Sequence, residues 1–206
     1  MLREVAMIIR SIEELRALYP PAKPRALQKQ LSRLDHHCRR FIALSPFVVL
    51  ASGDGTHQDA SPRGGAPGFV KVLDDTTLLI PDSPGNNRLD SLSNIIVSGR
   101  LGLLFLIPGV DESLRINGAA EVSVDEELLA QVEGERRTPR VVIRVTLEEA
   151  YLHCAKALMR SRLWADDSRR ERSVLPSMGE MLHDQTDGCG EPESQAAMLA
   201  RYQDEL

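Results

Sequence analysis

Short apolar segments separated by turn residues make up the middle of the chain. Residues 46–52 form a continuous apolar run, which is typical of a buried strand, whereas residues 68–73 alternate as a half-buried strand does. Turn signals such as Gly53-Asp54-Gly55 separate these runs. Together the patterns predict strands at residues 46–52, 57–61, 68–73, 77–80, 101–107, 114–122, 140–145 and 149–153. Short strands joined by turns favour an antiparallel barrel.

Helical patterns flank the strands at both ends of the chain. Ser11 and Glu14 have the spacing of a capping box, so a helix is expected to follow Ser11. Leucines and Cys38 at helical spacing predict a second helix from about residue 24 to 41, and further helices are predicted at residues 125–132, 177–182 and 193–202. We therefore expect a single, mainly β domain with an N-terminal helical segment (1–45), a barrel core (46–155) and a C-terminal helical tail (156–206) that packs on a partner subunit.

The segment after residue 80 combines a chain break with a short helix. Pro84-Gly85 interrupts the preceding strand, and Ser83 or Asn86 is expected to cap the helix. Its apolar face would carry Leu89, Leu92, Ile95 and Ile96, and its opposite face Arg88, Ser91 and Asn94. A helix start offers free N–H groups and a positive dipole, so an Arg in the first turn suits a phosphate. The alternative is an ordinary capped surface helix with a solvated Arg.

Composition and charge exclude several broad classes. The 206 residues are 42% hydrophobic and 27% charged, and the net charge of −5 disfavours a general nucleic-acid or anionic-membrane binder. No apolar run approaches the roughly 20 residues that span a bilayer, and the N-terminus lacks the pattern of a signal peptide. Cys38, Cys154 and Cys189 are too widely separated for a zinc or disulfide framework. We expect a cytoplasmic protein with no nucleic-acid or membrane partner.

A metal site is also not expected. His36 and His37 follow Asp35, but neighbouring residues on a helix point in directions about 100° apart and do not share a ligand face. No other cluster of Cys, His and acidic residues has a metal-ligand spacing.

Several short motifs occur in a characteristic order. They are Phe41-Ile42-Ala43-Leu44-Ser45-Pro46-Phe47, Ser61-Pro62-Arg63-Gly64, Asn87-Arg88-Leu89-Asp90-Ser91, Arg115-Ile116-Asn117-Gly118, His153-Cys154-Ala155-Lys156-Ala157 and Arg160-Ser161-Arg162-Leu163-Trp164. Over roughly residues 15–182 this order resembles the pyridoxamine 5'-phosphate oxidase-related FMN-binding split-barrel family. The resemblance implies an antiparallel, Greek-key-like split β-barrel with peripheral helices, FMN as cofactor and a homodimer.

The residues expected to bind FMN fall into three groups. Cations would hold the phosphate, small or apolar residues would form the slot for the ring, and the resemblance implies that His153 and Trp164 reach the flavin of a neighbouring subunit. The full set is Ser61, Pro62, Arg63, Gly64, Ile80, Pro81, Asn87, Arg88, Ser91, Arg115, His153, Lys156, Arg160 and Trp164. Two alternatives stay open: Arg115 as a surface strand residue, and Trp164 as an interface anchor.

Two features of genuine pyridoxamine-phosphate oxidases are missing. Little room exists between Ile107 and Leu114 for the helix that would hold the substrate phosphate, and Met181 replaces the Arg expected two positions before His183. We therefore expect a flavin-dependent oxidoreductase that acts on an unidentified small substrate, with a nicotinamide donor as a further partner. No catalytic residue is assigned. The alternatives are an FMN storage or sensing protein without turnover and a haem-handling relative of the same barrel.

Overall fold

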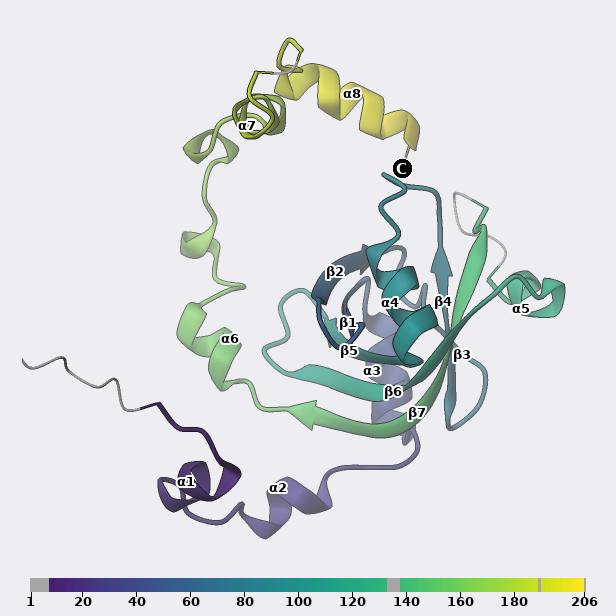
Figure 1. Ribbon diagram of the computed structural model, residues 1–206, viewed down its shortest axis with the longest axis vertical. Coiled ribbons are helices and arrows are strands. Elements are labelled where there is room, and N and C mark those ends of the chain that lie inside the picture. Colours follow the sequence, from purple (N-terminus) through teal and green to yellow (C-terminus); the bar gives the residue numbers. More distant parts are fainter. Residues whose placement is uncertain (1–7, 133–137, 189, 206) are drawn as a thin grey trace, which may run out of the picture.

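One curved antiparallel sheet forms the centre of the molecule (Figure 1). The computed structural model describes residues 8–132, 138–188 and 190–205. The strands follow one another in space as β2-β1-β5-β6-β7-β4-β3, and each neighbouring pair is antiparallel. Their bounds are β1 Phe47–Gly53, β2 Gln58–Gly64, β3 Lys71–Val72, β4 Thr77–Asp82, β5 Arg100–Leu106, β6 Ser113–Ser123 and β7 Val141–His153. The predicted antiparallel barrel with peripheral helices is confirmed.

Helices lie before, within and after the sheet. The α-helices are α1 Ile12–Ala17, α2 Pro24–Gln28, α3 His36–Leu44, α4 Asp90–Ser98, α5 Glu126–Ala130, α6 Lys156–Ser161, α7 Met178–Gln185 and α8 Gln195–Glu205, with 3-10 turns at Asp166–Ser168 and Arg172–Val174. Ser11 caps α1 as predicted, since its hydroxyl accepts from the Glu14 N–H at 3.1 Å.

The barrel is split between the two ends of the sheet. β2 ends the sheet on one side, and β3 with β4 ends it on the other. An ion pair crosses this split, because Arg63 Nη2 of β2 lies 3.6 Å from Asp82 Oδ1 of β4. Away from this split, the sheet is continuous through β1, β5, β6 and β7 and encloses the core.

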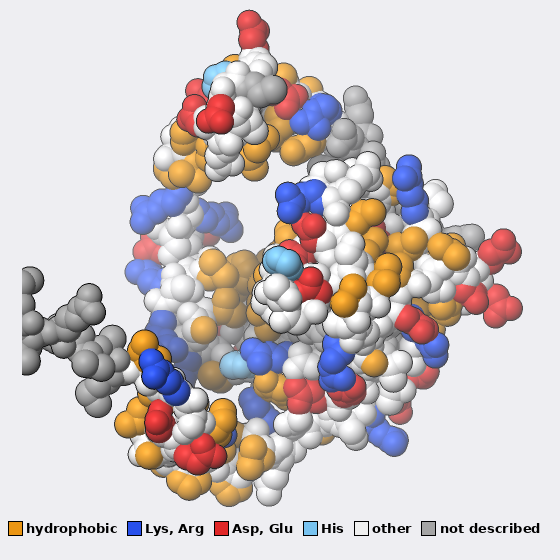
Figure 2. All heavy atoms as spheres, in the orientation of Figure 1, with side chains coloured by type: hydrophobic (Ala, Val, Ile, Leu, Met, Phe, Trp, Pro, Cys, Tyr) orange, Lys and Arg blue, Asp and Glu red, His pale blue; other side chains and the backbone are white. Residues whose placement is uncertain are grey.

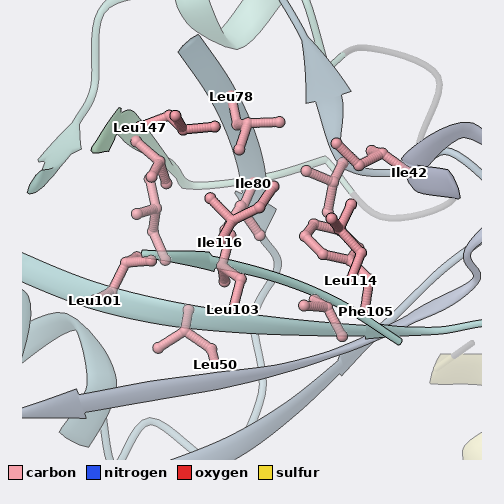
Figure 3. Packing of buried hydrophobic residues seen from close by; sticks show 14 of the residues in the cluster. Ile42, Leu50, Leu78, Ile80, Leu101, Leu103, Phe105, Leu114, Ile116 and Leu147 are labelled. Carbon is pink, nitrogen blue, oxygen red and sulfur yellow. The ribbon is translucent and has the colours of Figure 1, made fainter. Parts of the chain in front are cut away.

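The core fills the inside of the barrel (Figure 3). Leu50 of β1, Phe105 of β5 and Ile116 of β6 alternate with more exposed neighbours and are at most 1% exposed. Ile42 of α3 reaches the same cluster. Burying each such side chain contributes about 1.5–3 kcal/mol, so the strand alternation that the sequence shows also stabilises the closed sheet.

A single long strand replaces the two predicted at residues 140–145 and 149–153. Asn117 of β6 is opposite Glu149, but Gly118 is opposite Leu147, so Glu148 is an extra residue in a bulge of β7. Glu148, a polar residue that breaks the apolar pattern of the sequence, is therefore part of β7. Gly118 is required at this position, because a Cβ there would lie 2.2 Å from the carbonyl oxygen of Thr146.

The helix predicted for residues 24–41 is wrong, because the chain forms two helices with a break between them. Leu31 leaves the helix and exchanges backbone hydrogen bonds of 2.8 Å with Ala150 of β7. The Asp35 carboxylate then accepts from the Cys38 N–H at 2.8 Å and begins α3. Pairing with the sheet and a new N-cap thus override the helical spacing of the leucines.

Helix α4 begins later than the sequence pattern indicates. Asp90 is its first residue, Leu89 at the N-cap has a left-handed φ of 61°, and neither Ser83 nor Asn86 caps it. The predicted apolar face is confirmed for Leu92 and Ile95, which are buried, and wrong for Ile96 and Leu89, which are 73% and 53% exposed. Hydrogen bonds turn the polar side inward instead: Asn94 Nδ2 donates to Ser52 Oγ at 3.2 Å in the interior.

The tail after residue 155 leaves the barrel through α6 and forms an arc, and α8 at its end runs back toward the barrel in this view (Figure 1). Ser177 and Glu180 form a capping box that begins α7, and α7 packs against α8. Neither α6 nor α7 contributes a buried residue, and hydrophobic side chains gather on the tail and on the N-terminal helices (Figure 2). Trp164 ties the first part of the tail to the barrel, since its Nε1 donates to the Val110 carbonyl at 2.9 Å.

The two cysteines that the structure describes should differ sharply in reactivity; Cys189 lies outside the described residues. Cys38 is a buried residue of α3, and burial together with the hydrogen bond to Asp35 raises the pKa of its thiol to about 11. Cys154 is exposed. Because the thiolate is the nucleophile, we expect iodoacetamide at pH 8 to label Cys154 in the native protein and Cys38 only after unfolding. Peptide mass spectrometry checks this, and rapid native labelling of Cys38 would contradict the burial.

Candidate functional site: a groove at the split of the barrel

A groove with a volume of about 650 Å³ lies where the two ends of the sheet approach each other. One wall is β2, and the other is the end of β4 with the loop that leads into α4. Phe69 and Leu92 supply apolar surface, while the other lining side chains are mostly polar or charged. The groove therefore offers a mixed surface, open to solvent, on which a ligand with both apolar and anionic parts can lie.

The structure brings most of the predicted site residues together here. The predicted residues that line the groove are Ser61, Pro62, Arg63, Gly64, Pro81, Asn87, Arg88 and Ser91. Strand alternation explains the contribution of β2, since Asp59, Ser61 and Arg63 are two apart and face the same side.

A carboxylate links the two walls of the groove. Asp59 Oδ2 accepts one hydrogen bond from the Ser61 hydroxyl at 2.8 Å and another from the Ser91 hydroxyl at 2.6 Å. Ser91 belongs to the first turn of α4 and is buried, so this contact fixes the helix start against β2. The hydrogen bond from Ser91, with smaller effects from Ser61 and Arg63, lowers the pKa of Asp59, which therefore stays ionised at neutral pH.

Arg63 is held by an ion pair across the split. Its guanidinium lies 3.6 Å from the Asp82 carboxylate and also donates to the Pro62 carbonyl at 3.1 Å. The Arg63 side chain is 24% and the Asp82 side chain 18% exposed. Burial raises the pKa of Asp82, and the charge of Arg63 opposes that rise. The pair thus places a guanidinium in the groove at the cost of desolvating a carboxylate.

Arg88 lies at the rim rather than in the first turn of α4. Its Nε donates to Asp90 Oδ2 at 2.8 Å, and its side chain is 74% exposed. The backbone around it is constrained, because Asn87 and Leu89 both have left-handed φ values, of 58° and 61°. No side chain caps α4, so the N–H groups of its first turn remain available beside Arg88. Guanidinium and helix start can therefore act on one anion.

The charges of the groove do not by themselves favour an anion. Three lining carboxylates face two lining guanidinium groups, which leaves a formal charge of −1. Both guanidinium groups are paired, Arg63 with Asp82 and Arg88 with Asp90. A phosphate would have to draw the guanidinium groups from these carboxylates, or receive further positive charge from outside the groove.

Six predicted residues do not line the groove of their own chain. The Ile80 side chain is fully buried and points into the core among Leu103 and Ile116 (Figure 3). The others are Arg115, His153, Lys156, Arg160 and Trp164, on β6, β7 and the start of the tail.

Arg115 and His153 belong to a separate cluster around Tyr151. Arg115 Nη1 donates to the Tyr151 hydroxyl at 3.0 Å, and the His153 ring centroid is 5.9 Å from that of Tyr151. Partial burial, with the charges of Arg115 and Lys29, lowers the pKa of His153. This cluster presents neutral imidazole and cations on the outer side of the barrel.

Sequence reasoning missed the acidic residues of the groove. Asp59 stands two positions before Ser61 on a predicted strand, so the two-residue period was a usable signal. Asp82 lies beyond the strand end predicted at residue 80, and no local pattern marks it as a groove residue. Asp90 stands inside the motif that supplied Asn87, Arg88 and Ser91, but it was not assigned to the site. In the part of the chain that the structure describes, no three or more His, Cys, Asp or Glu side chains lie together in a way that could hold a metal ion. Likewise, none of the helices within residues 8–132, 138–188 and 190–205 is long and apolar enough to cross a membrane.

Solved structures of similar shape come from several bacteria. HupZ from Group A Streptococcus is 16% identical, with a TM-score of 0.48 over 58% of this chain and 93% of that chain. An FAD binding protein from Mycobacterium smegmatis is 14% identical, with a TM-score of 0.43 over 60% and 97% of the two chains. An FMN-binding protein from Syntrophomonas wolfei is 9% identical, with a TM-score of 0.40 over 56% and 88%.

The sequence itself gives the family. No curated protein matches the chain. The family model described as pyridoxamine 5'-phosphate oxidase matches residues 34–154, which is more than half of the 206 residues. The match runs from the loop before α3 to the end of β7 and so contains the whole sheet and the groove. This chain therefore belongs to the pyridoxamine 5'-phosphate oxidase family.

Proposed function

We propose that the groove at the split of the barrel binds FMN. The observation that carries the proposal is the meeting of Arg63, Arg88 and the uncapped start of α4 around one groove, in a chain of this family. An FMN phosphate is a dianion near neutral pH, and guanidinium groups with free N–H groups are its usual partners in proteins. Arg88 and the α4 start would hold the phosphate, and Arg63 would reach it from β2.

The flavin ring would lie on the apolar and small residues of the same groove. Phe69 and Pro81 offer apolar surface, and Gly64 leaves its backbone open to close approach. When bound, the flavin supplies redox chemistry, whereas the residues of this chain bind it, orient it and limit the access of water. We propose a flavin-dependent oxidoreductase of a small substrate, since the bound flavin would itself supply the redox chemistry.

The activity of a genuine pyridoxamine-phosphate oxidase is not part of this proposal. Residues 107–112, all of them described, join β5 to β6 without a helix, so the element that would hold the substrate phosphate is missing. His183 lies in α7, and its Nδ1 is 2.8 Å from the Gly190 carbonyl oxygen. Its position in the tail separates it from the groove.

A second copy of the chain would complete the site. The groove has a formal charge of −1, while Lys156 and Arg160 are exposed outside it, next to the exposed apolar side chains of Met159 and Leu163. We propose a homodimer in which the tail packs on the partner and this basic segment, with His153 and Trp164, approaches the partner's groove. The hollow between tail and barrel, open in Figure 2, leaves room for such packing.

Titration with FMN and riboflavin tests the phosphate assignment. We expect the purified protein to bind about one FMN per chain and to prefer FMN over riboflavin by roughly tenfold or more, because the two share the ring and only FMN carries the phosphate. Quenching of flavin fluorescence measures both affinities. Equal affinities would contradict the phosphate site, and an absorption spectrum dominated by haem would favour the haem-handling alternative.

Turnover separates the enzyme from a storage or sensing protein. Anaerobic mixing of the FMN-loaded protein with a nicotinamide donor should bleach the flavin absorbance if the protein is an oxidoreductase that uses this donor. Tight binding without reduction by nicotinamide or quinone donors would favour storage or sensing.

A further inference from the structure

We propose that Asp59 accepts a hydrogen bond from a hydroxyl group of the ligand's polyol chain and thereby makes the groove selective for flavins that carry such a chain. This inference rests on the proposed flavin site. It assigns a ligand-binding role to a residue that no motif of the family resemblance contributed.

The carboxylate of Asp59 is positioned before any ligand arrives. Both hydrogen bonds that it accepts from side chains, from Ser61 at 2.8 Å and from Ser91 at 2.6 Å, end on the same oxygen, Oδ2. Neither of them uses Oδ1, and Asp59 lines the groove. One oxygen is thus held by the two walls, while the carboxylate keeps capacity to accept from a third donor.

The charge of Asp59 needs a partner when a phosphate is present. Arg63 and Arg88 are ion-paired with Asp82 and Asp90, so Asp59 shares the charge of Arg63 with a second carboxylate. A carboxylate near a phosphate opposes its binding unless it makes a compensating contact. A polyol hydroxyl is a neutral donor that a carboxylate accepts strongly, and in FMN such hydroxyls lie between the ring and the phosphate.

Asp59 is also hydrogen-bonded to one residue on each of the two walls of the groove, Ser61 and Ser91. Ser61 and Pro62 continue along β2 toward Phe69 and the apolar surface, and Ser91 belongs to the α4 start beside Arg88. A chain connecting a ring on the β2 wall with a phosphate at the α4 start would therefore pass the carboxylate that joins these two walls.

The test compares Asp59→Asn with the unaltered protein against three probes: lumiflavin, which lacks the polyol chain, riboflavin, which has it, and FMN. Asparagine keeps the shape and an oxygen that accepts from Ser61 and Ser91, but it removes the charge. We expect riboflavin affinity to fall by about tenfold and lumiflavin affinity to stay unchanged. FMN affinity should fall less than riboflavin affinity, because the substitution also removes repulsion of the phosphate. Asp166→Asn, an exposed acid in the tail, is the matched control and should change none of the three.

The outcomes separate this inference from the proposed site. An equal fall for riboflavin and lumiflavin would mean that Asp59 only holds the groove walls together and would overturn the inference. An unchanged affinity for riboflavin would overturn it as well. In both cases FMN binding by the unaltered protein would still support the groove as a flavin site. If the unaltered protein binds none of the probes, the proposed function itself is wrong and this inference is wrong with it.

Discussion

Replacing both Arg63 and Arg88 by alanine is expected to weaken FMN binding by on the order of a thousandfold. A hydrogen bond to a charged group contributes about 1.5–3 kcal/mol, so each single substitution should cost roughly ten- to a hundredfold in affinity. The two residues lie on separate walls and have different carboxylate partners, Asp82 and Asp90, but both would contact the same phosphate, so the double variant should lose more affinity than either single variant without following their simple product. Riboflavin affinity should change little, because riboflavin has no phosphate.

The two arginines should differ in their effect on folding. Arg88 is 74% exposed, so Arg88→Ala should leave the melting temperature unchanged. Arg63→Ala leaves the half-buried carboxylate of Asp82 without its cation, and the pKa of Asp82, already raised by burial, should rise further. We expect Arg63→Ala to lower the melting temperature at neutral pH, and the added change Asp82→Asn to restore it without restoring FMN binding.

Fluorescence titration of FMN, with thermal unfolding of the same samples, checks both effects. Arg169→Ala is the matched control, because Arg169 is an exposed arginine of the tail whose carboxylate neighbour, Asp166, lies 3.6 Å away. A loss of affinity in Arg169→Ala as large as that in Arg88→Ala would show that overall charge, rather than a site, governs binding.

The barrel could be predicted from the sequence because its signals are local. Alternation along β5 and β6 reports which side of each strand is buried, and turn residues report where each strand ends. The pairing of Leu31 with Ala150 and the bulge at Glu148 have no such local signal. Each depends on a strand more than a hundred residues away or on the register of a neighbour, which a pattern along one segment does not contain.

The groove was predictable only in part for the same reason. The motifs around Ser61 and Arg88 gave most of its lining, but the position of Arg88 before α4 was not visible, since Leu89 adopts a left-handed conformation that sequence patterns do not assign to leucine. Asp82 was missed because an acidic residue at a strand end is usually solvated. The pairing of Asp82 with Arg63 exists only because the two ends of the sheet meet.

The largest effect on assembly is expected from charge introduced at the start of the tail. Met159 and Leu163 are 59% and 47% exposed, although Trp164 fixes this segment to the Val110 carbonyl of the barrel. Apolar side chains held rigidly in water are typical of an interface that a partner covers. The double variant Met159→Asp/Leu163→Asp should weaken dimerisation by on the order of a thousandfold, since each buried charge without a partner costs about 2 kcal/mol or more.

Light scattering at micromolar concentration measures this change, and Arg169→Asp, a charge reversal at an exposed site of the same tail, should leave the dimer intact. FMN affinity should fall together with dimerisation, although neither Met159 nor Leu163 lines the groove. This coupling follows from the charge of the groove: with a formal charge of −1 inside one chain, the phosphate depends on cations such as Lys156 and Arg160 that only a second chain would bring. A monomeric variant that binds FMN as tightly as the unaltered protein would place the whole site within one chain. The paired guanidinium groups of Arg63 and Arg88 would then have to hold the phosphate alone.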